Sequence, residues 1–294
     1  MLPNSLLAGL AAPIRARLKA PVLCQLAGED MFLDDFPPAH REAALRELRR
    51  RARDLDGFMA PNRYYADFMA EYLGIGRESI HIAPIGVDTR GYPSEPRSKS
   101  GPFVVAYLAR ICPHKGLHWL AEAFHVLKND PAARDCRLRV AGYLGPEHKR
   151  YFESVKGRLA SWGLADSFEH AGQLGREEKV RFLSEASVVV LPSEYPEPKG
   201  IPLAEALAAG TPVVAVNSGC FPEWIEATNG GLLAEPKSSV GLASAIAELM
   251  RDRSLADRLA RQGHRSIHQR FDHHAMAEGA LAVFRRFVSS VSAR

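Results

Sequence analysis

The stretch LPSEYPEPKGIPLAEALAAGTPVVAV, residues 191–216, contains most of what decides the fold. It starts at the end of Val188–Leu191, an uninterrupted apolar run that suits a strand covered on both faces of a parallel sheet. A loop with three prolines follows, then Gly200, a small-residue helix over Ile201–Ala209 and a second apolar run at Val213–Val216. The stretch therefore predicts a strand, a helix and a second strand parallel to the first.

The same alternation of short apolar runs and helical stretches extends outward along the chain. Expected strands are Pro21–Leu26, Gly57–Ala60, Ile80–Ala83, Phe103–Leu108, Leu138–Ala141, Phe168–Ala171, Val188–Leu191, Val213–Val216 and Gly231–Ala234. Expected helices include Leu117–Lys128, Glu147–Trp162, Glu177–Glu185, Ile201–Ala209 and most of the chain after Ser239. Such alternation is typical of β-α-β units, so we predict an α/β fold with parallel sheets.

Residues 91–102, GYPSEPRSKSGP, combine prolines, glycines, serines and charges without an apolar period, which predicts a linker. The apolar runs after it suffice for a complete Rossmann-like domain, which we place at residues 97–270. The runs before it suffice for only about half of one, so residues 1–96 are predicted to be a partial N-terminal domain. Residues 271–294 are predicted to form a C-terminal helix.

Composition excludes several classes of protein. Four cysteines without a C-x-x-C pair argue against a disulfide framework or a zinc site and fit a reducing cytoplasm. No apolar run approaches the roughly 18–20 residues that span a bilayer. The formal net charge of +4 permits an anionic partner without requiring one, and we expect no nucleic-acid partner.

Two carboxylates of the opening stretch, Glu197 and Glu205, are candidate ligand contacts. Ligands of parallel sheets bind beyond the carboxyl ends of the strands, where Glu197 is expected. Phosphates can bind at a helix start, and Gly200 would let the backbone approach them closely. Glu205, further along the helix, could accept hydrogen bonds from sugar or ribose hydroxyls. The alternative is two solvated glutamates beside an ordinary turn, and the spacing alone favours this alternative.

A second candidate segment is VVAYLARICPHKGLHWLAEAF, residues 104–124, in which an expected strand leads into a loop. That loop contains Arg110 and Lys115 and is followed by Gly116 and an amphipathic helix. A guanidinium fork and a compact ammonium suit a diphosphate. The alternative is a pair of solvated loop cations.

Together the two segments resemble the retaining glycosyltransferase family four, the group 1 glycosyl transferases with the two-domain GT-B fold. In that family an Arg precedes Lys-Gly by five residues, as Arg110 precedes Lys115 here. A later pair of glutamates eight apart is followed by Ala-Leu-Ala, Gly and Pro-Val-Val, and Glu197 and Glu205 match this pair. Gly200 matches the second glycine of the motif. Pro198-Lys199 departs from the family's usual Gly and aromatic residue, which leaves the contacts around the sugar open.

The resemblance implies transfer of a sugar from a UDP-, GDP- or ADP-sugar to a saccharide, lipid-linked or small-molecule acceptor in the cleft between the domains. It implies retention of anomeric configuration, with no cofactor and no obligatory metal. Arg110 and Lys115 would hold the donor diphosphate, Glu197 would contact the transferred sugar, and these three are the predicted catalytic residues. Glu205 would bind the donor ribose, and Gly200 with Ile201 would complete the donor site.

The resemblance covers the N-terminal part less closely. LAGEDMFLDD, residues 26–35, resembles the acceptor-side loop of the family, so Gly28, Glu29 and Asp30 are acceptor-side candidates, although a simple acidic loop explains them equally well. Many members carry a histidine where this chain has Ala27. Members also have strands ahead of the point that matches residue 1, so the chain is interpreted as lacking the start of its N-terminal domain. The last helix is expected to pack back on that domain.

Residues 41–54 form a predicted helix with six arginines. Such a helix could lie on anionic lipid at the inner membrane face, but a solvated face with pairs such as Glu42–Arg46 is the favoured reading. We therefore predict a cytoplasmic enzyme, with peripheral membrane contact as the weaker alternative.

Two rival functions stay open. One is a catalytically inactive fragment that binds nucleotide sugars, and the other is a sugar-nucleotide epimerase of the same architecture. A nicotinamide-dependent dehydrogenase is poorly supported, because no G-x-G-x-x-G opens a helix after a strand.

Overall fold

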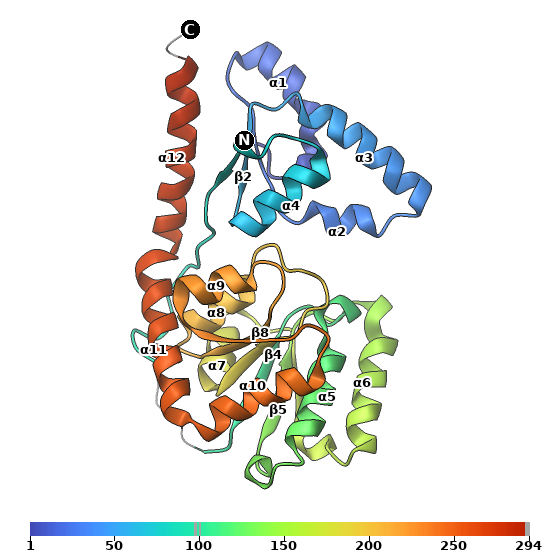
Figure 1. The fold of residues 1–294 in the computed structure, drawn as a ribbon, viewed down its shortest axis with the longest axis vertical. Coiled ribbons are helices and arrows are strands. Elements are labelled where there is room, and N and C mark those ends of the chain that lie inside the picture. Colours follow the sequence, from blue (N-terminus) through green and yellow to red (C-terminus); the bar gives the residue numbers. More distant parts are fainter. Residues whose placement is uncertain (97–98, 100, 292–294) are drawn as a thin grey trace. The chain divides into compact units, whose positions relative to one another are not determined.

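The computed structural model describes residues 1–96, 99 and 101–291 and divides the chain into two compact units (Figure 1). Unit 1 consists of Met1–Gly86 with His273–Arg294, and unit 2 is the continuous stretch Val87–Asp272. Residues 97, 98 and 100 of the predicted linker lie outside the described residues, as do residues 292–294.

Within the described part of unit 2, six parallel strands form one sheet in the order β6-β5-β4-β7-β8-β9. The chain leaves β4 toward one edge of the sheet and returns to place β7 on the other side of β4. This reversal is a topological switch point, where loops at the carboxyl ends of neighbouring strands diverge and leave room for a ligand. The strands are β4 (Val104–Leu108), β5 (Arg137–Ala141), β6 (Phe168–Gly172), β7 (Val188–Leu191), β8 (Val213–Val216) and β9 (Gly231–Ala234).

The helices of unit 2 pack in two groups. Helix α5 contacts α6 and α10, whereas α8 contacts α7, α9 and α11. Strands β5 and β6 are added on one side of β4, and β7, β8 and β9 on the other. Because the chain moves across the sheet in opposite directions in these two parts, right-handed crossovers place α5 and α8 on opposite faces of the sheet. The described helices are α5 (Leu117–Leu127), α6 (Lys149–Ser161), α7 (Arg176–Glu185), α8 (Ile201–Ala208), α9 (Phe221–Thr228), α10 (Ser239–Arg251) and α11 (Arg253–Arg270), with 3-10 turns at Pro113–Lys115, Pro131–Ala133, Pro146–His148 and Ala165–Ser167.

Burial explains why the central strands could be recognised from sequence. All four residues of β7 and of β8 are buried, as expected for strands that helices cover on both faces. The α/β class with parallel sheets is thus confirmed. The predicted helix Glu147–Trp162 instead begins with a 3-10 turn at Pro146–His148 and becomes α-helical at Lys149.

The described strands of unit 1 form a smaller parallel sheet in the order β1-β2-β3. They are β1 (Leu23–Gln25), β2 (Gly57–Ala60) and β3 (Ile80–Ile82), and β1 is shorter than the predicted Pro21–Leu26. The accompanying helices are α1 (Ala11–Leu18), α2 (Glu29–Asp34), α3 (Pro38–Ala52), α4 (Arg63–Leu73) and α12 (His273–Val291), with 3-10 turns at Ser5–Leu10 and Arg77–Ser79.

Helix α12, dark red in Figure 1, joins unit 1 through an aromatic contact with the sheet. The Phe287 ring packs edge-on against His81 of β3, with ring centroids 5.3 Å apart. A side chain at Gly57 of β2 would collide with the same ring, since its Cβ would lie 2.4 Å from Phe287 Cζ. The glycine therefore makes room for the returning helix.

Residues 87–96 group with unit 2, whereas composition placed the division at 96/97. The Val87 N–H donates to Phe271 O at 2.9 Å, and the Arg176 guanidinium donates to the carbonyls of Asp88 and Arg90 at 2.8 and 2.7 Å. Composition shows where a chain is polar and irregular. The carbonyls of Asp88 and Arg90 are held by the Arg176 side chain, which is distant in sequence, and composition does not predict such a contact.

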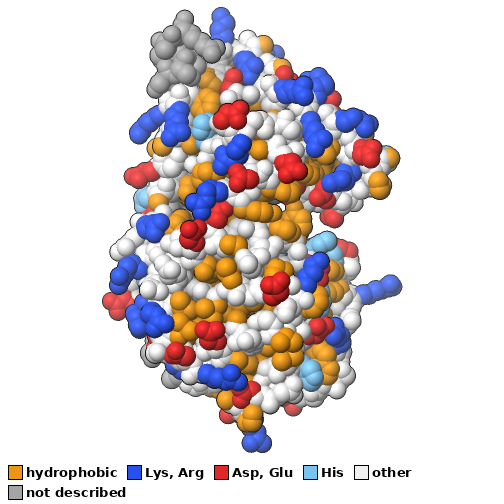
Figure 2. Space-filling model, in the orientation of Figure 1, with side chains coloured by type: hydrophobic (Ala, Val, Ile, Leu, Met, Phe, Trp, Pro, Cys, Tyr) orange, Lys and Arg blue, Asp and Glu red, His pale blue; other side chains and the backbone are white. Residues whose placement is uncertain are grey.

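Helix α3 carries the predicted basic run, and its arginines are largely paired. Arg50 and Arg51 contact Glu47 at 2.6 and 2.7 Å, and the predicted pair Glu42–Arg46 is present at 3.9 Å. On the face shown in Figure 2, basic and acidic side chains are interspersed, in keeping with the mild net charge. Among the described helices, none is both long and apolar enough to cross a membrane.

Candidate functional site

The candidate site is built at the carboxyl ends of β4 and β7, which pair directly with each other. The loop after β4 carries Arg110 and Lys115, and the loop after β7 carries Glu197 and Gly200. The parallel pairing brings the two predicted segments to the same edge of the sheet. The sequence predicted each loop, and the strand order explains why they meet.

The Lys115 ammonium forms an ion pair with the Glu197 carboxylate, and each side chain is only 12% exposed. Burial, with a smaller contribution from the positive charge of Arg110, lowers the pKa of Lys115 to about 8. The paired carboxylate favours the charged ammonium and so opposes this shift. Arg110 itself is exposed, and no described carboxylate forms an ion pair with it. The site thus offers one buried and one exposed cation.

The approach of the two loops depends on Gly116. Its backbone is left-handed, with φ +70°, and a Cβ there would lie 1.9 Å from the carbonyl oxygen of Pro192. The N–H groups of Glu194 and Tyr195 donate to His114 O at 3.0 and 3.3 Å. These backbone contacts fix the Lys115 loop against the Glu197 loop.

Helix α8 begins directly after Gly200, which has φ +72° and provides no side-chain cap. A Cβ at Gly200 would lie 2.6 Å from Trp224 Nε1, whose N–H donates to Lys199 O at 2.8 Å. Ile201, the first helical residue, is 44% exposed. An uncapped helix start at a switch point presents backbone N–H groups that suit an anion.

Glu205 lies one turn further along α8, where it is paired with a residue that the sequence analysis missed. The Lys179 ammonium of α7 donates to Glu205 Oε1 at 2.5 Å, and the glutamate side chain is 15% exposed. The alternative in which Glu205 is a solvated glutamate beside an ordinary turn is therefore not what the structure has. No local sequence signal marks Lys179, because the contact depends on how α7 packs on α8.

The loop that carries Glu197 is also held from α9. Cys220 N–H donates to Glu197 O at 2.8 Å, and Gly219, with φ +62°, lies so close that a Cβ would be 2.4 Å from Glu197 N. The backbone at Glu197 is thereby fixed by a second segment of unit 2.

The acceptor-side candidates Gly28, Glu29 and Asp30 all lie in unit 1. Glu29 is 5% exposed, and its carboxylate accepts hydrogen bonds from Ser5 N, Ser5 Oγ and Ala27 N at 3.0, 2.6 and 2.6 Å. Asp30 is 1% exposed and accepts from the Tyr65 hydroxyl at 2.5 Å, while that hydroxyl accepts from Gly28 N at 2.8 Å. Both carboxylates are therefore buried and held by hydrogen bonds within unit 1. Their acceptor role stays a prediction.

Burial also raises the pKa of the Asp30 carboxyl, and the hydrogen bond from Tyr65 opposes this shift. Both acids lie in the first turn of α2, where the positive end of the helix dipole favours negative charge.

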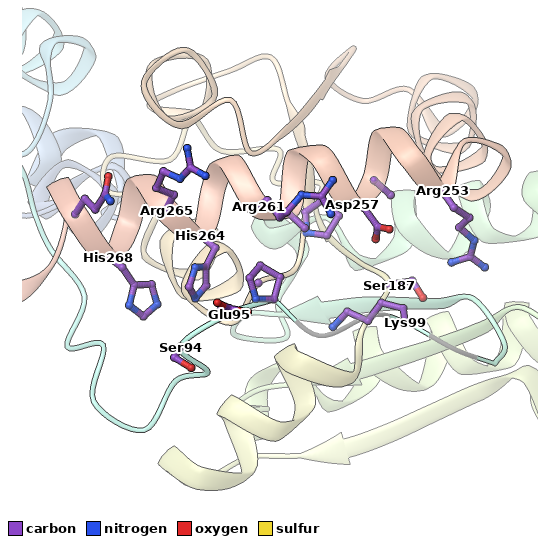
Figure 3. Close-up of a pocket in the computed structure, with 16 residues that line it drawn as sticks. Ser94, Glu95, Lys99, Ser187, Arg253, Asp257, Arg261, His264, Arg265 and His268 are labelled. Atoms are coloured by element: carbon purple, nitrogen blue, oxygen red, sulfur yellow. The ribbon is translucent and has the colours of Figure 1, made fainter.

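A cavity of about 660 Å³ lies elsewhere in unit 2, between α11 and the segment that carries Ser94 and Glu95 (Figure 3). His264 and His268 point from α11 toward that segment, whereas Arg265 points away from it. Ser187, also in the lining, precedes β7, so the cavity is at the amino ends of the strands. It is therefore separate from the candidate site.

Across residues 1–96, 99 and 101–291, no three His, Cys, Asp or Glu side chains group as a metal ion would require.

Comparisons with known proteins show which family and fold the chain resembles. The model of a family described as "Glycosyl transferases group 1" matches residues 89–266. The chain is 27% identical over 241 residues to a glycogen synthase of Mycobacterium tuberculosis, covering 79% of this chain and 54% of the relative. It is 30% identical over 273 residues to a GDP-mannose-dependent alpha-(1-6)-phosphatidylinositol monomannoside mannosyltransferase of the same species, covering 84% and 67%.

Solved structures show the same fold. Sucrose-phosphate synthase from Thermosynechococcus elongatus superimposes with a TM-score of 0.81 at 20% identity, covering 98% of this chain and 73% of that one. HepE from Anabaena, solved in complex with UDP-glucose, gives a TM-score of 0.76 at 20% identity, covering 99% and 77%. The first curated relatives are longer, and the chain spans about half of the glycogen synthase.

Proposed function

The chain belongs to the family of group 1 glycosyl transferases, and on this premise we propose that it transfers a sugar from a nucleotide diphosphate sugar to a hydroxyl acceptor. The observation that carries the proposal is the convergence of Lys115, Glu197 and the uncapped start of α8 at the switch point. A cation and a free helix start together suit a diphosphate, and a neighbouring carboxylate suits sugar hydroxyls.

The donor would lie with its diphosphate between Lys115, Arg110 and the backbone at Gly200 and Ile201. Glu205 would accept hydrogen bonds from the ribose hydroxyls, and the ion pair with Lys179 orients its carboxylate for this. Glu197, held by Lys115 and by Cys220 N, would contact the transferred sugar.

In the proposed reaction the bond between the anomeric carbon and the diphosphate oxygen breaks, and a bond from that carbon to the acceptor oxygen forms on the same face. The acceptor proton passes to the departing diphosphate, which acts as the base. Configuration is retained. Arg110 and Lys115 stabilise the negative charge that develops on the leaving group, and such prearranged charges usually contribute most to catalysis of this kind. The proposal needs no metal and no cofactor.

UDP-, GDP- and ADP-sugars are the proposed donors, and the acceptor is a saccharide, a lipid-linked saccharide or a small molecule. Among solved neighbours, HepE was captured with UDP-glucose, whereas one relative is named as GDP-mannose-dependent. We also propose a cytoplasmic location, which the four buried free cysteines support. Peripheral membrane contact through α3 is the weaker alternative, because its arginines largely have acidic partners.

The test is thermal denaturation of the purified chain with UDP-, GDP-, ADP- and dTDP-sugars. We expect one base to raise the melting temperature, by the mass action of a ligand that binds only the folded state. No stabilisation by any of the four would overturn donor binding, and with it the proposed activity.

A catalytically inactive fragment that binds nucleotide sugars is the second candidate, because the residues proposed to hold the donor all lie in unit 2. Product analysis separates the possibilities. Transfer to an added acceptor supports the enzyme, stabilisation without turnover supports the fragment, and conversion of the donor without any acceptor indicates an epimerase.

A further inference from the structure

The carboxylate of Glu194 joins the two loops of the candidate site, and neither the motifs nor the proposed chemistry uses it. Its Oε1 accepts a hydrogen bond from Trp119 Nε1 at 2.6 Å and lies 3.1 Å from His118 Nε2. Trp119 and His118 belong to the first turn of α5, directly after Lys115 and Gly116. Glu194 itself follows β7 and comes shortly before Glu197.

Glu194 contacts the Lys115 loop on both sides of Lys115. Its backbone N–H donates to the carbonyl of His114 at 3.0 Å, just before the lysine. Its side chain holds His118 and Trp119, just after the lysine. A long flexible side chain such as that of Lys115 is placed accurately only if the backbone on each side of it is fixed.

The contact extends to α6 through a chain of hydrogen bonds. The Tyr151 hydroxyl lies 2.9 Å from His118 Nδ1 and accepts from the His118 backbone N–H at 3.2 Å. A hydroxyl that accepts from this N–H can donate its own proton to Nδ1, and Nε2 of His118 can then donate its N–H to Glu194. The hydroxyl also satisfies an N–H at the start of α5, which the N-cap Gly116 does not cap.

The charge on Glu194 is part of this arrangement. Burial alone would raise the pKa of its carboxyl, but the hydrogen bond from Trp119 and the proximity of His118 bring it below its usual value. Charge-assisted hydrogen bonds are shorter and stronger than neutral ones, in line with the 2.6 Å contact to Trp119.

We propose that Glu194 is a positioning residue that fixes Lys115 relative to Glu197 for binding of the donor diphosphate. The inference rests on the proposed function for its ligand, but the coupling of the two loops is a property of the protein alone. It can therefore be measured with and without a nucleotide.

The first experiment is hydrogen exchange on the full chain without nucleotide, read at peptides covering residues 113–119 and 192–200. In Glu194→Ala both peptides should exchange about tenfold faster, the change that loss of one charge-assisted hydrogen bond allows. Trp119→Phe removes the N–H donor and keeps a smaller aromatic ring, so it should also speed exchange at both peptides. Glu194→Gln keeps an acceptor oxygen without its charge and should restore part of the protection.

Glu122→Ala is the matched control. Glu122 also ties α5 to α6, through an ion pair with Arg158 at 2.6 Å, but further along the helix. It should lower stability without changing exchange at the two loops. Unchanged exchange in Glu194→Ala, or an equal change in Glu122→Ala, would overturn the positioning role.

The second experiment is titration calorimetry with UDP, GDP and ADP. The nucleotide that binds the wild type should bind Glu194→Ala and Trp119→Phe about tenfold more weakly, and the double variant no more weakly than either. Faster exchange without loss of affinity would also overturn the proposal. If the wild type binds none of the three, the proposed function fails, while the exchange experiment still decides whether Glu194 couples the loops.

Discussion

The Lys115 ammonium and the Glu197 carboxylate form an ion pair across the carboxyl ends of two adjacent parallel strands, with both side chains 12% exposed. A donor diphosphate bound at Lys115 therefore meets an ammonium that already has a partner. Its binding free energy includes the cost of sharing or breaking that pair, and in return the lysine side chain is already placed where the diphosphate is needed.

Donor affinity should fall as pH rises through about 8. Burial and the charge of Arg110 lower the pKa of Lys115 to about 8, and only the protonated ammonium attracts a diphosphate. Affinity should be greatest below this pKa and should decline above it by at most about tenfold per pH unit. Calorimetry at a series of pH values checks this. Lys115→Arg, whose guanidinium stays charged, should give a flat profile, and a decline of equal steepness there would assign the titration to another group.

Glu205→Ala should weaken donor binding by roughly tenfold to a hundredfold, because the ribose hydroxyls lose a charged acceptor. Lys179→Met should weaken it less, since the glutamate remains but is no longer held by the ammonium. Thermal shifts with the selected nucleotide sugar measure both effects. Glu185→Ala, at the far end of α7 and paired with Arg139, is the control and should leave binding unchanged. Full affinity in Glu205→Ala would refute the ribose assignment.

Gly116→Ala should destabilise unit 2 by about 2–4 kcal/mol, since the new methyl group meets Pro192 O and the backbone is left-handed. Gly157→Ala is the contrasting change. It lies within α6, where a Cβ meets nothing within 4 Å, so it should stabilise by up to about 1 kcal/mol. Urea denaturation measures both. A neutral Gly116→Ala would mean that the two donor loops can separate without cost.

Glu29→Gln should lower the stability of unit 1 by about 1–3 kcal/mol and leave nucleotide affinity unchanged. The carboxylate accepts three hydrogen bonds from Ser5 and Ala27, and an amide cannot accept all three equally well. Asp35→Ala, an exposed acid at the end of α2, should have little effect on either. If Glu29→Gln is fully stable but loses transfer to the acceptor, the acceptor-side role is the correct one.

The sequence predicted the parts of the molecule that depend on local pattern. Strands such as β7 and β8 are short, wholly apolar and bounded by turn residues, so their positions and the loops after them could be placed closely. The convergence of Lys115 and Glu197 follows from parallel strands and one switch point, both of which the alternation of elements implies.

Contacts between side chains of different elements could not be predicted in the same way. The pair Lys179–Glu205 depends on the packing of α7 against α8, and Glu194–Trp119 on a loop crossing the start of α5. The burial of Glu29 depends on its hydrogen bond with Ser5, and the strands predicted for the N-terminal part do not indicate that these two residues lie close together. Each of these contacts joins polar residues that follow no periodic pattern, so the sequence does not predict it.

Unit 1 is discontinuous, since α12 belongs to it although the whole of unit 2 comes between. During synthesis the ribosome therefore completes unit 2 while unit 1 still lacks the helix whose Phe287 packs against His81. Because domains generally fold as units and earlier segments emerge first, the first 86 residues keep that surface uncovered until α12 has been made. Unit 2, which is continuous in sequence, can thus fold before unit 1 is complete.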